Sequence, residues 1–123
     1  MQLNWVVIGA VGAAISIGLG AFGAHGLKSR IDVEALALWE TAARYLMYAS
    51  LGLVTIGLLD RQTPGLAGSS GLMLAAGAAV FSATLVALTL GGPRWLGAIT
   101  PIGGALMIVG WLRLAWGALK SLN

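Results

Sequence analysis

Glu40 and Arg44 are the residues best suited to chemistry, because an acid and a base stand four positions apart inside a long apolar stretch. Residues with this spacing share one face of a helix, and acid before base is the favoured order for an ion pair. A charge near the bilayer centre costs roughly 2.5–3.5 kcal/mol on insertion scales, so such side chains usually meet a partner. Two interpretations stay open. The charges, with Tyr48 at their edge, form a proton, cation or head-group site, or they close on each other and fix the helix register.

Two further polar side chains lie in apolar surroundings. His25 ends the first apolar stretch, where it fits either a structural hydrogen bond at a helix C-terminus or a proton relay to Glu40. Arg113 stands about two turns before the end of the last stretch, so it either reaches back to the interface or needs an acceptor inside the protein. Both residues are therefore candidate site residues.

Composition restricts the class of protein. Of the 123 residues, 59% are hydrophobic and 9% are charged, whereas soluble domains carry about 25% charged residues. The seven Lys and Arg residues are scattered, which argues against a nucleic-acid partner. With no cysteine, one histidine and no nucleophile or phosphate-loop motif, the sequence predicts no metal site, no cofactor and no enzyme activity. Membrane lipids are the expected partners, and a homo-oligomer stays open.

Four apolar stretches position these residues. A helix crosses a bilayer with about 20 residues at 1.5 Å each, and the stretches cover residues 3–27, 35–59, 66–90 and 95–119. Their short connections predict an all-α, up-down-up-down transmembrane bundle, a single domain over residues 1–123. Asp32 is the expected N-cap of the second helix. The distribution of Lys and Arg favours both termini outside.

The start of the fourth span has two interpretations. Thr100 followed by Pro101 has the form of an N-cap and a first-turn proline, so we expect a break or kink there. The alternative is one kinked helix from Arg94.

Small residues recur at helical spacing in every span, and close helix contact in membranes depends on such residues. We predict that these stripes pack within one bundle, and that any stripe left outside serves an oligomer. Tryptophans near span ends are expected at the membrane interface, Trp39 among them, whereas Trp111 is expected to pack inside. The stripes comprise Gly9, Gly12, Ser16, Gly20 and Gly23; Ala43, Ser50 and Gly57; Gly71, Ala75, Ala78 and Ser82; and Gly103, Gly110 and Gly117.

Three separated motifs resemble the domain-of-unknown-function family 423: GAFGAHGL at 20–27, WETAARYLMY at 39–48 and RWLGAITPIGG at 94–104. The resemblance implies a small, multi-pass protein of the bacterial cytoplasmic (inner) membrane with four helices. It marks His25, Glu40, Arg44 and Thr100-Pro101 as signature positions, without roles, and brings no activity, substrate or cofactor. The expected function is therefore structural or lipid-interacting. The alternative is an oligomeric small-molecule or proton-coupled transporter or channel that uses Glu40 and His25.

Overall fold

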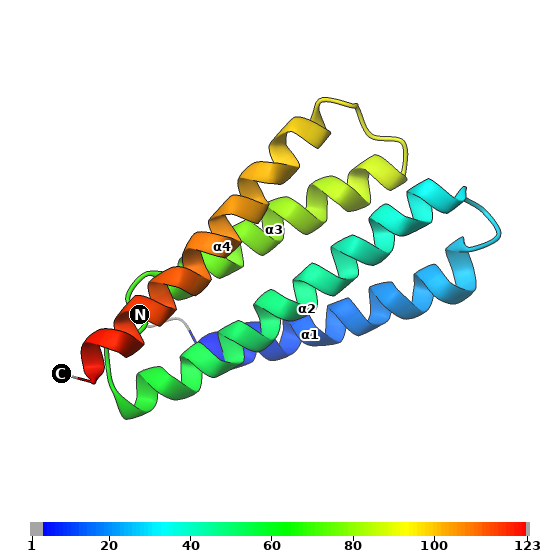
Figure 1. Cartoon of the computed structure of the whole chain (residues 1–123). Coiled ribbons are helices and arrows are strands. Elements are labelled where there is room, and N and C mark those ends of the chain that lie inside the picture. Colours follow the sequence, from blue (N-terminus) through cyan, green and yellow to red (C-terminus); the bar gives the residue numbers. More distant parts are fainter. Residues whose placement is uncertain (1–3, 123) are drawn as a thin grey trace.

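The computed structural model describes residues 4–122 as four long helices (Figure 1). They are α1 (Trp5–Phe22), which continues into a π-helical turn η1 (Gly23–Leu27), then α2 (Val33–Gln62), α3 (Ser70–Thr89) and α4 (Leu96–Ser121). All four are long and apolar enough to cross a membrane. They run up-down-up-down, and the start of α1 lies at the same end of the molecule as the end of α4 (Figure 1). The predicted all-α four-span architecture is confirmed.

The connections explain where the helices begin and end. Asp32 caps α2 as predicted, because its Oδ1 accepts the backbone N–H of Ala35 at 2.7 Å. α3 begins at Ser70, four residues later than the sequence suggested, because the preceding turn contains Gly65 and Gly68 at positive φ. A left-handed residue cannot continue a helix, and glycine adopts it without strain.

α4 runs through Pro101 as one helix, so the chain is not broken at Thr100–Pro101, and the alternative of a single helix describes the structure, although the helix begins at Leu96 and not at Arg94. A kink at this position remains a prediction. A proline beyond the first turn removes one backbone hydrogen bond and its ring crowds the carbonyl four residues earlier, so it costs stability without having to end the helix. Thr100 is not an N-cap. Its Oγ1 donates to the carbonyl of Leu96 at 3.0 Å and lies 2.6 Å from Oγ1 of Thr84 in α3. The hydrogen bond between these two buried hydroxyls connects the start of α4 to α3.

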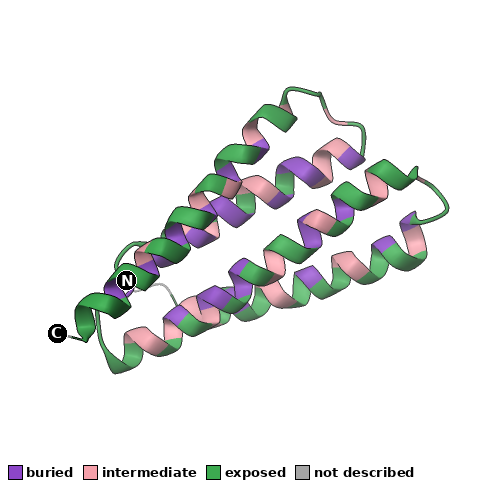
Figure 2. Ribbon diagram, viewed as in Figure 1, coloured by how far each residue is buried: buried purple, intermediate pink, exposed green. Residues whose placement is uncertain are grey.

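The helices form two antiparallel hairpins, α1–α2 and α3–α4, which meet along α2 and α3. α1 and α4 lie at opposite edges, and the hairpins diverge toward the end that carries the α1–α2 and α3–α4 turns (Figure 1). Buried residues follow the contacts between neighbouring helices (Figure 2). The outer faces carry exposed apolar side chains, as expected for surfaces that meet lipid; examples are Val7, Ile15, Leu58, Ile102 and Leu112.

Two buried serines, one on each helix that packs against α2, donate hydrogen bonds to adjacent backbone carbonyls of α2. Ser16 of α1 donates its hydroxyl to the carbonyl of Ala43, and Ser82 of α3 donates to the carbonyl of Ala42 at 3.0 Å. Both serines belong to the predicted small-residue stripes. Gly9 belongs to the same stripe of α1, and a Cβ built there would lie 2.8 Å from the backbone nitrogen of Val54 in α2.

The stripe of α4 packs against α3 in the same way. A Cβ built at Gly103 would lie 2.6 Å from the backbone nitrogen of Phe81 and 2.8 Å from the carbonyl of Gly77. One built at Gly110 would lie 3.1 Å from Cγ of Leu74. These small residues therefore serve contacts within the bundle, as predicted, and they allow neighbouring backbones to touch.

Candidate functional site

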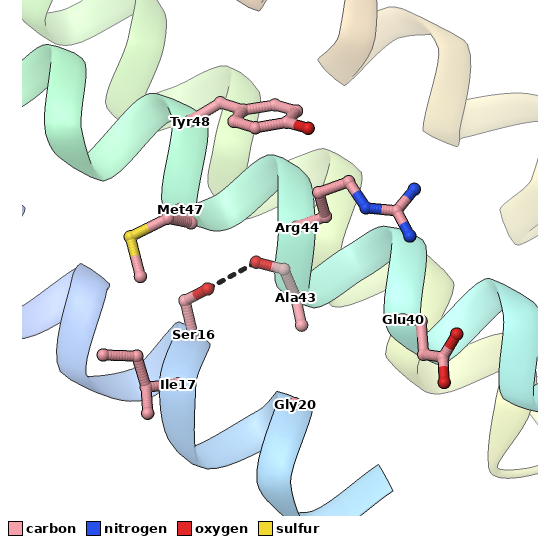
Figure 3. A pocket seen from close by; sticks show the side chains of 8 residues that line it. All are labelled: Ser16, Ile17, Gly20, Glu40, Ala43, Arg44, Met47 and Tyr48. Atoms are coloured by element: carbon pink, nitrogen blue, oxygen red, sulfur yellow. Dashed lines mark hydrogen bonds between the residues drawn. The ribbon is translucent and has the colours of Figure 1, made fainter. Parts of the chain in front are cut away.

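Glu40 and Arg44 stand at an open depression of about 340 Å³ between α1 and α2 (Figure 3). α1 contributes mostly small residues and α2 contributes the charged and large ones. Its lining consists of Ser16, Ile17 and Gly20 from α1, and Glu40, Ala43, Arg44, Met47 and Tyr48 from α2. The Ser16 hydroxyl is already bonded to the backbone of α2 at the floor, so the free polar groups are those of α2.

The two charges do not close on each other. Both side chains are exposed, and in Figure 3 the Glu40 carboxylate and the Arg44 guanidinium point in different directions with no hydrogen bond between them. The interpretation as a closed ion pair is wrong for this structure. A spacing of four residues makes a pair reachable, but side-chain torsions decide whether it forms.

Helix length places the charges at the edge of the hydrocarbon layer. The 30 residues of α2 measure about 45 Å, against about 30 Å of hydrocarbon, so several ångströms protrude on each side if the helix is centred. Glu40 then lies within roughly 3 Å of the hydrocarbon boundary, and Arg44 about one turn deeper. Helical side chains lean toward the N-terminus, and the Arg44 side chain extends along α2 toward the Glu40 side (Figure 3).

Tyr48 separates this depression from a second, aromatic groove. The groove has a volume of about 440 Å³ and lies between α2, α3 and α4, with Tyr48 on its wall as well. The ring centroids of Tyr45 and Tyr48 are 5.2 Å apart, and that of Phe81 lies 5.1 Å from Tyr45. Trp111 closes the groove from α4 with its ring edge against Gly52, yet it remains 41% exposed.

His25 lies in the π-helical turn η1, exposed, and it does not line the depression. The turn lies beside a contact with α2. The indole Nε1 of Trp39 donates to the carbonyl of Leu19 at 2.7 Å, next to the place where α1 changes to η1. Gly23 leaves room for this ring, since a Cβ there would lie 2.7 Å from its Cδ1. Trp39 is only 4% exposed, so its ring packs within the bundle, and its predicted depth at the membrane interface remains a prediction.

The predicted polar cluster is therefore assembled in part. Glu40, Arg44 and Tyr48 share the depression, whereas His25 stands apart on η1. Within residues 4–122, no group of three His, Cys, Asp or Glu side chains is placed to hold a metal ion.

Sequence reasoning did not assign the α1 wall to this site. The small-residue stripe of α1 includes Gly20, which lines this wall. In the structure a Cβ built at Gly20 meets no atom within 4 Å. Gly20 thus leaves the depression open instead of packing against α2. The other two candidate residues lie elsewhere: Thr100 in the α3–α4 contact and Arg113 at the opposite end of the bundle.

Four spans with short turns and apolar outer faces define a small membrane protein. The model of a protein family of unknown function, DUF423, matches residues 19–104, and the chain belongs to this family. A UPF0382 membrane protein of Staphylococcus saprophyticus is 44% identical over 116 residues, 94% of this chain and 97% of that protein. The UPF0382 membrane protein YwdK of Bacillus subtilis is 38% identical over 120 residues, 96% of this chain and 98% of that protein. No solved structure gives a significant match.

Proposed function

We propose that this chain is a non-enzymatic lipid-binding protein of the bacterial cytoplasmic membrane. It would hold a phospholipid with a zwitterionic head group at the depression between α1 and α2. The observation that carries the proposal is that Glu40 and Arg44 are unpaired with each other and stand at one end of an apolar depression. A carboxylate and a guanidinium with free hydrogen-bonding capacity at the head-group boundary need partners of opposite charge.

A head group with a phosphate and a primary ammonium supplies both partners. The Arg44 guanidinium matches the phosphate, for which arginine forms bidentate hydrogen bonds. The Glu40 carboxylate accepts hydrogen bonds from the ammonium. An acyl chain below the head group would lie along Ile17 and Met47, whose apolar side chains line the rest of the depression. Phosphatidylethanolamine has this chemistry, whereas phosphatidylcholine lacks the ammonium N–H donors.

Glycine substitutions on α1 test the site with a matched pair. Gly20→Leu fills the depression, while Gly18→Leu adds the same side chain at an exposed position that does not line it and meets no atom within 4 Å. We expect phosphatidylethanolamine binding in native mass spectrometry to fall at least about tenfold for Gly20→Leu and to stay unchanged for Gly18→Leu. Equal binding by both variants would refute the proposed site.

Head-group selectivity tests the charges separately. The parent protein should prefer phosphatidylethanolamine to phosphatidylcholine, and Glu40→Gln should reduce that preference, because a neutral amide oxygen accepts a weaker hydrogen bond from the ammonium than a carboxylate does. Arg44→Gln should weaken both lipids, since both carry the phosphate. If Glu40→Gln leaves the preference intact, the carboxylate does not contact the head group.

Transport through Glu40 and His25 is the competing function. Both side chains lie on exposed faces and small residues fill the helix contacts, so a proton path would have to follow an oligomer interface. We expect no proton flux from protein reconstituted in liposomes that contain a pH-sensitive dye. A flux that Glu40→Gln or His25→Ala abolishes, in variants that still fold, would replace the lipid-binding proposal by a transporter.

A further inference from the structure

An open cavity of about 250 Å³, lined in part by charged side chains, lies at the other end of the bundle, between the α2–α3 turn and the last turns of α4. Residues 63–66 form one wall, and Arg113, Gly117, Lys120 and Ser121 form the other. A water molecule takes up about 30 Å³ in the liquid, so the cavity can admit a group several times that size. This end also carries both ends of the described chain (Figure 1).

Arg113 holds a buried donor that no group within residues 4–122 satisfies. Its Nη1 is shielded from solvent, and it has no hydrogen-bond partner within the described part of the chain. A buried charged donor without an acceptor is among the costliest defects in a folded protein. The guanidinium lies beside the α2–α3 turn at the end of the spans, and its Nη1 is not solvated there.

The backbone of the turn holds the guanidinium in place. A Cβ built at Gly68 would lie 2.7 Å from Cζ and 3.1 Å from Nε of Arg113. Gly68 also has a φ of +56°, in the left-handed region that favours glycine. The backbone conformation at Gly68 and the lack of room for a Cβ atom beside the guanidinium both require glycine at this position. The guanidinium of Arg113 therefore lies directly against the backbone of the turn.

The cavity wall carries a second cation and no acid. Lys120 lies two turns beyond Arg113 on the same helix, and both line the cavity. The neighbouring acid, Asp60, is not part of the lining, and its Oδ1 accepts the backbone N–H of Gly65 at 3.0 Å. Two positive charges with a buried, unsatisfied donor match an oxyanion with several acceptor atoms.

We propose that this cavity binds a phosphate group, which accepts hydrogen bonds from the Arg113 guanidinium and is balanced by the ammonium of Lys120. The site lies at the end of the spans, where head groups of anionic phospholipids are found, and a free phosphate ion presents the same chemistry. It is independent of the depression between α1 and α2, which belongs to the opposite half of the bundle (Figure 1).

Binding can be measured on the full chain in a neutral detergent, with the shift of the thermal unfolding midpoint as the readout. Phosphatidylglycerol and inorganic phosphate are titrated in separate arms at constant ionic strength, and diacylglycerol, which has no phosphate, serves as the neutral lipid. The variants are Arg113→Gln and Lys120→Gln. Arg94→Gln is the matched control, because it removes the same charge from the α3–α4 turn at the far end of the bundle.

We expect at least one of the two phosphate probes to stabilise the parent protein and Arg94→Gln to the same extent. Arg113→Gln should raise the apparent dissociation constant at least about tenfold, as loss of a charge-assisted hydrogen bond does. Lys120→Gln, at an exposed position, should raise it by a smaller factor and keeps the test valid if Arg113→Gln does not fold.

The two arms separate the sources of the phosphate. A response to phosphatidylglycerol alone identifies a lipid head group, and a response to inorganic phosphate identifies a free anion. No stabilisation by either probe overturns the proposal. Equal stabilisation of the parent, Arg113→Gln and Lys120→Gln overturns it as well.

Discussion

The contact between α3 and α4 at Gly103 gives the sharpest test of the helix packing. A methyl group at this position would meet backbone atoms of the other helix, 2.6 Å from the nitrogen of Phe81 and 2.8 Å from the carbonyl of Gly77. Ordinary contact begins near 3.4 Å, so the helices would have to separate by about 0.8 Å along this contact. Backbone cannot rotate away as a flexible side chain can.

The magnitude follows from two opposing effects. Overpacking of this kind costs about 1–3 kcal/mol, whereas replacing a helical glycine by alanine gains up to about 1 kcal/mol in intrinsic propensity. We expect Gly103→Ala to lose roughly 1–2 kcal/mol of unfolding free energy. Gly104→Ala is the matched control, because its Cβ would lie 3.4 Å from the nearest atom, Cδ1 of the Phe81 ring. It should be neutral or slightly stabilising.

The assay is reversible unfolding in mixed micelles as the fraction of sodium dodecyl sulfate rises, followed by circular dichroism. The two alanine variants should differ by about 2 kcal/mol. Gly77→Ala, on the other side of the same contact, should resemble Gly103→Ala. If Gly103→Ala is as stable as Gly104→Ala, the helices do not approach as closely as the structure has them, and the reasoning fails.

Three further expectations follow from the fold. Trp39→Phe removes the indole hydrogen bond to α1 and should cost about 1 kcal/mol in the same unfolding assay, while Trp95→Phe, at a position 63% exposed, should change stability by less than about 0.5 kcal/mol. The effects of Glu40→Gln and Arg44→Gln should add, with a coupling energy under about 0.5 kcal/mol; a coupling above about 1 kcal/mol would mean that the two side chains pair. Single cysteines at positions 2 and 122 of this cysteine-free chain should label from the same side of the membrane, and labelling from opposite sides would exclude an even number of spans.

Patterns confined to one helix could be read from the sequence. Four apolar runs, each long enough to cross a bilayer as a helix, predicted the four spans. Asp32 could be predicted as the N-cap of α2 because the cap depends only on the next three residues. The stripe of Gly9 and Ser16 gave a packing face, since helical spacing alone places these residues together. The shared face of Glu40 and Arg44 follows from the same geometry, and the structure places both at one depression.

Features that join distant segments could not be read in this way. The N-cap interpretation of Thr100 failed because its hydroxyl finds Thr84, sixteen residues earlier, on the neighbouring helix. The position of Trp39 in the sequence did not indicate that its indole donates to the carbonyl of Leu19 on α1. In both cases the hydrogen-bond partner of the side chain lies on another helix, and the local sequence does not identify that partner.

The sequence by itself determined the class of protein, its four spans, the small-residue packing faces and the acid and base at the start of the second span. Only the tertiary structure decided that Glu40 and Arg44 stay apart beside an open depression, and that Arg113 keeps an unsatisfied donor against Gly68. The physical reason is the range of the forces involved. Hydropathy and helical period act along one chain segment, whereas hydrogen-bond satisfaction depends on which atoms the packing of separate helices brings within about 3 Å.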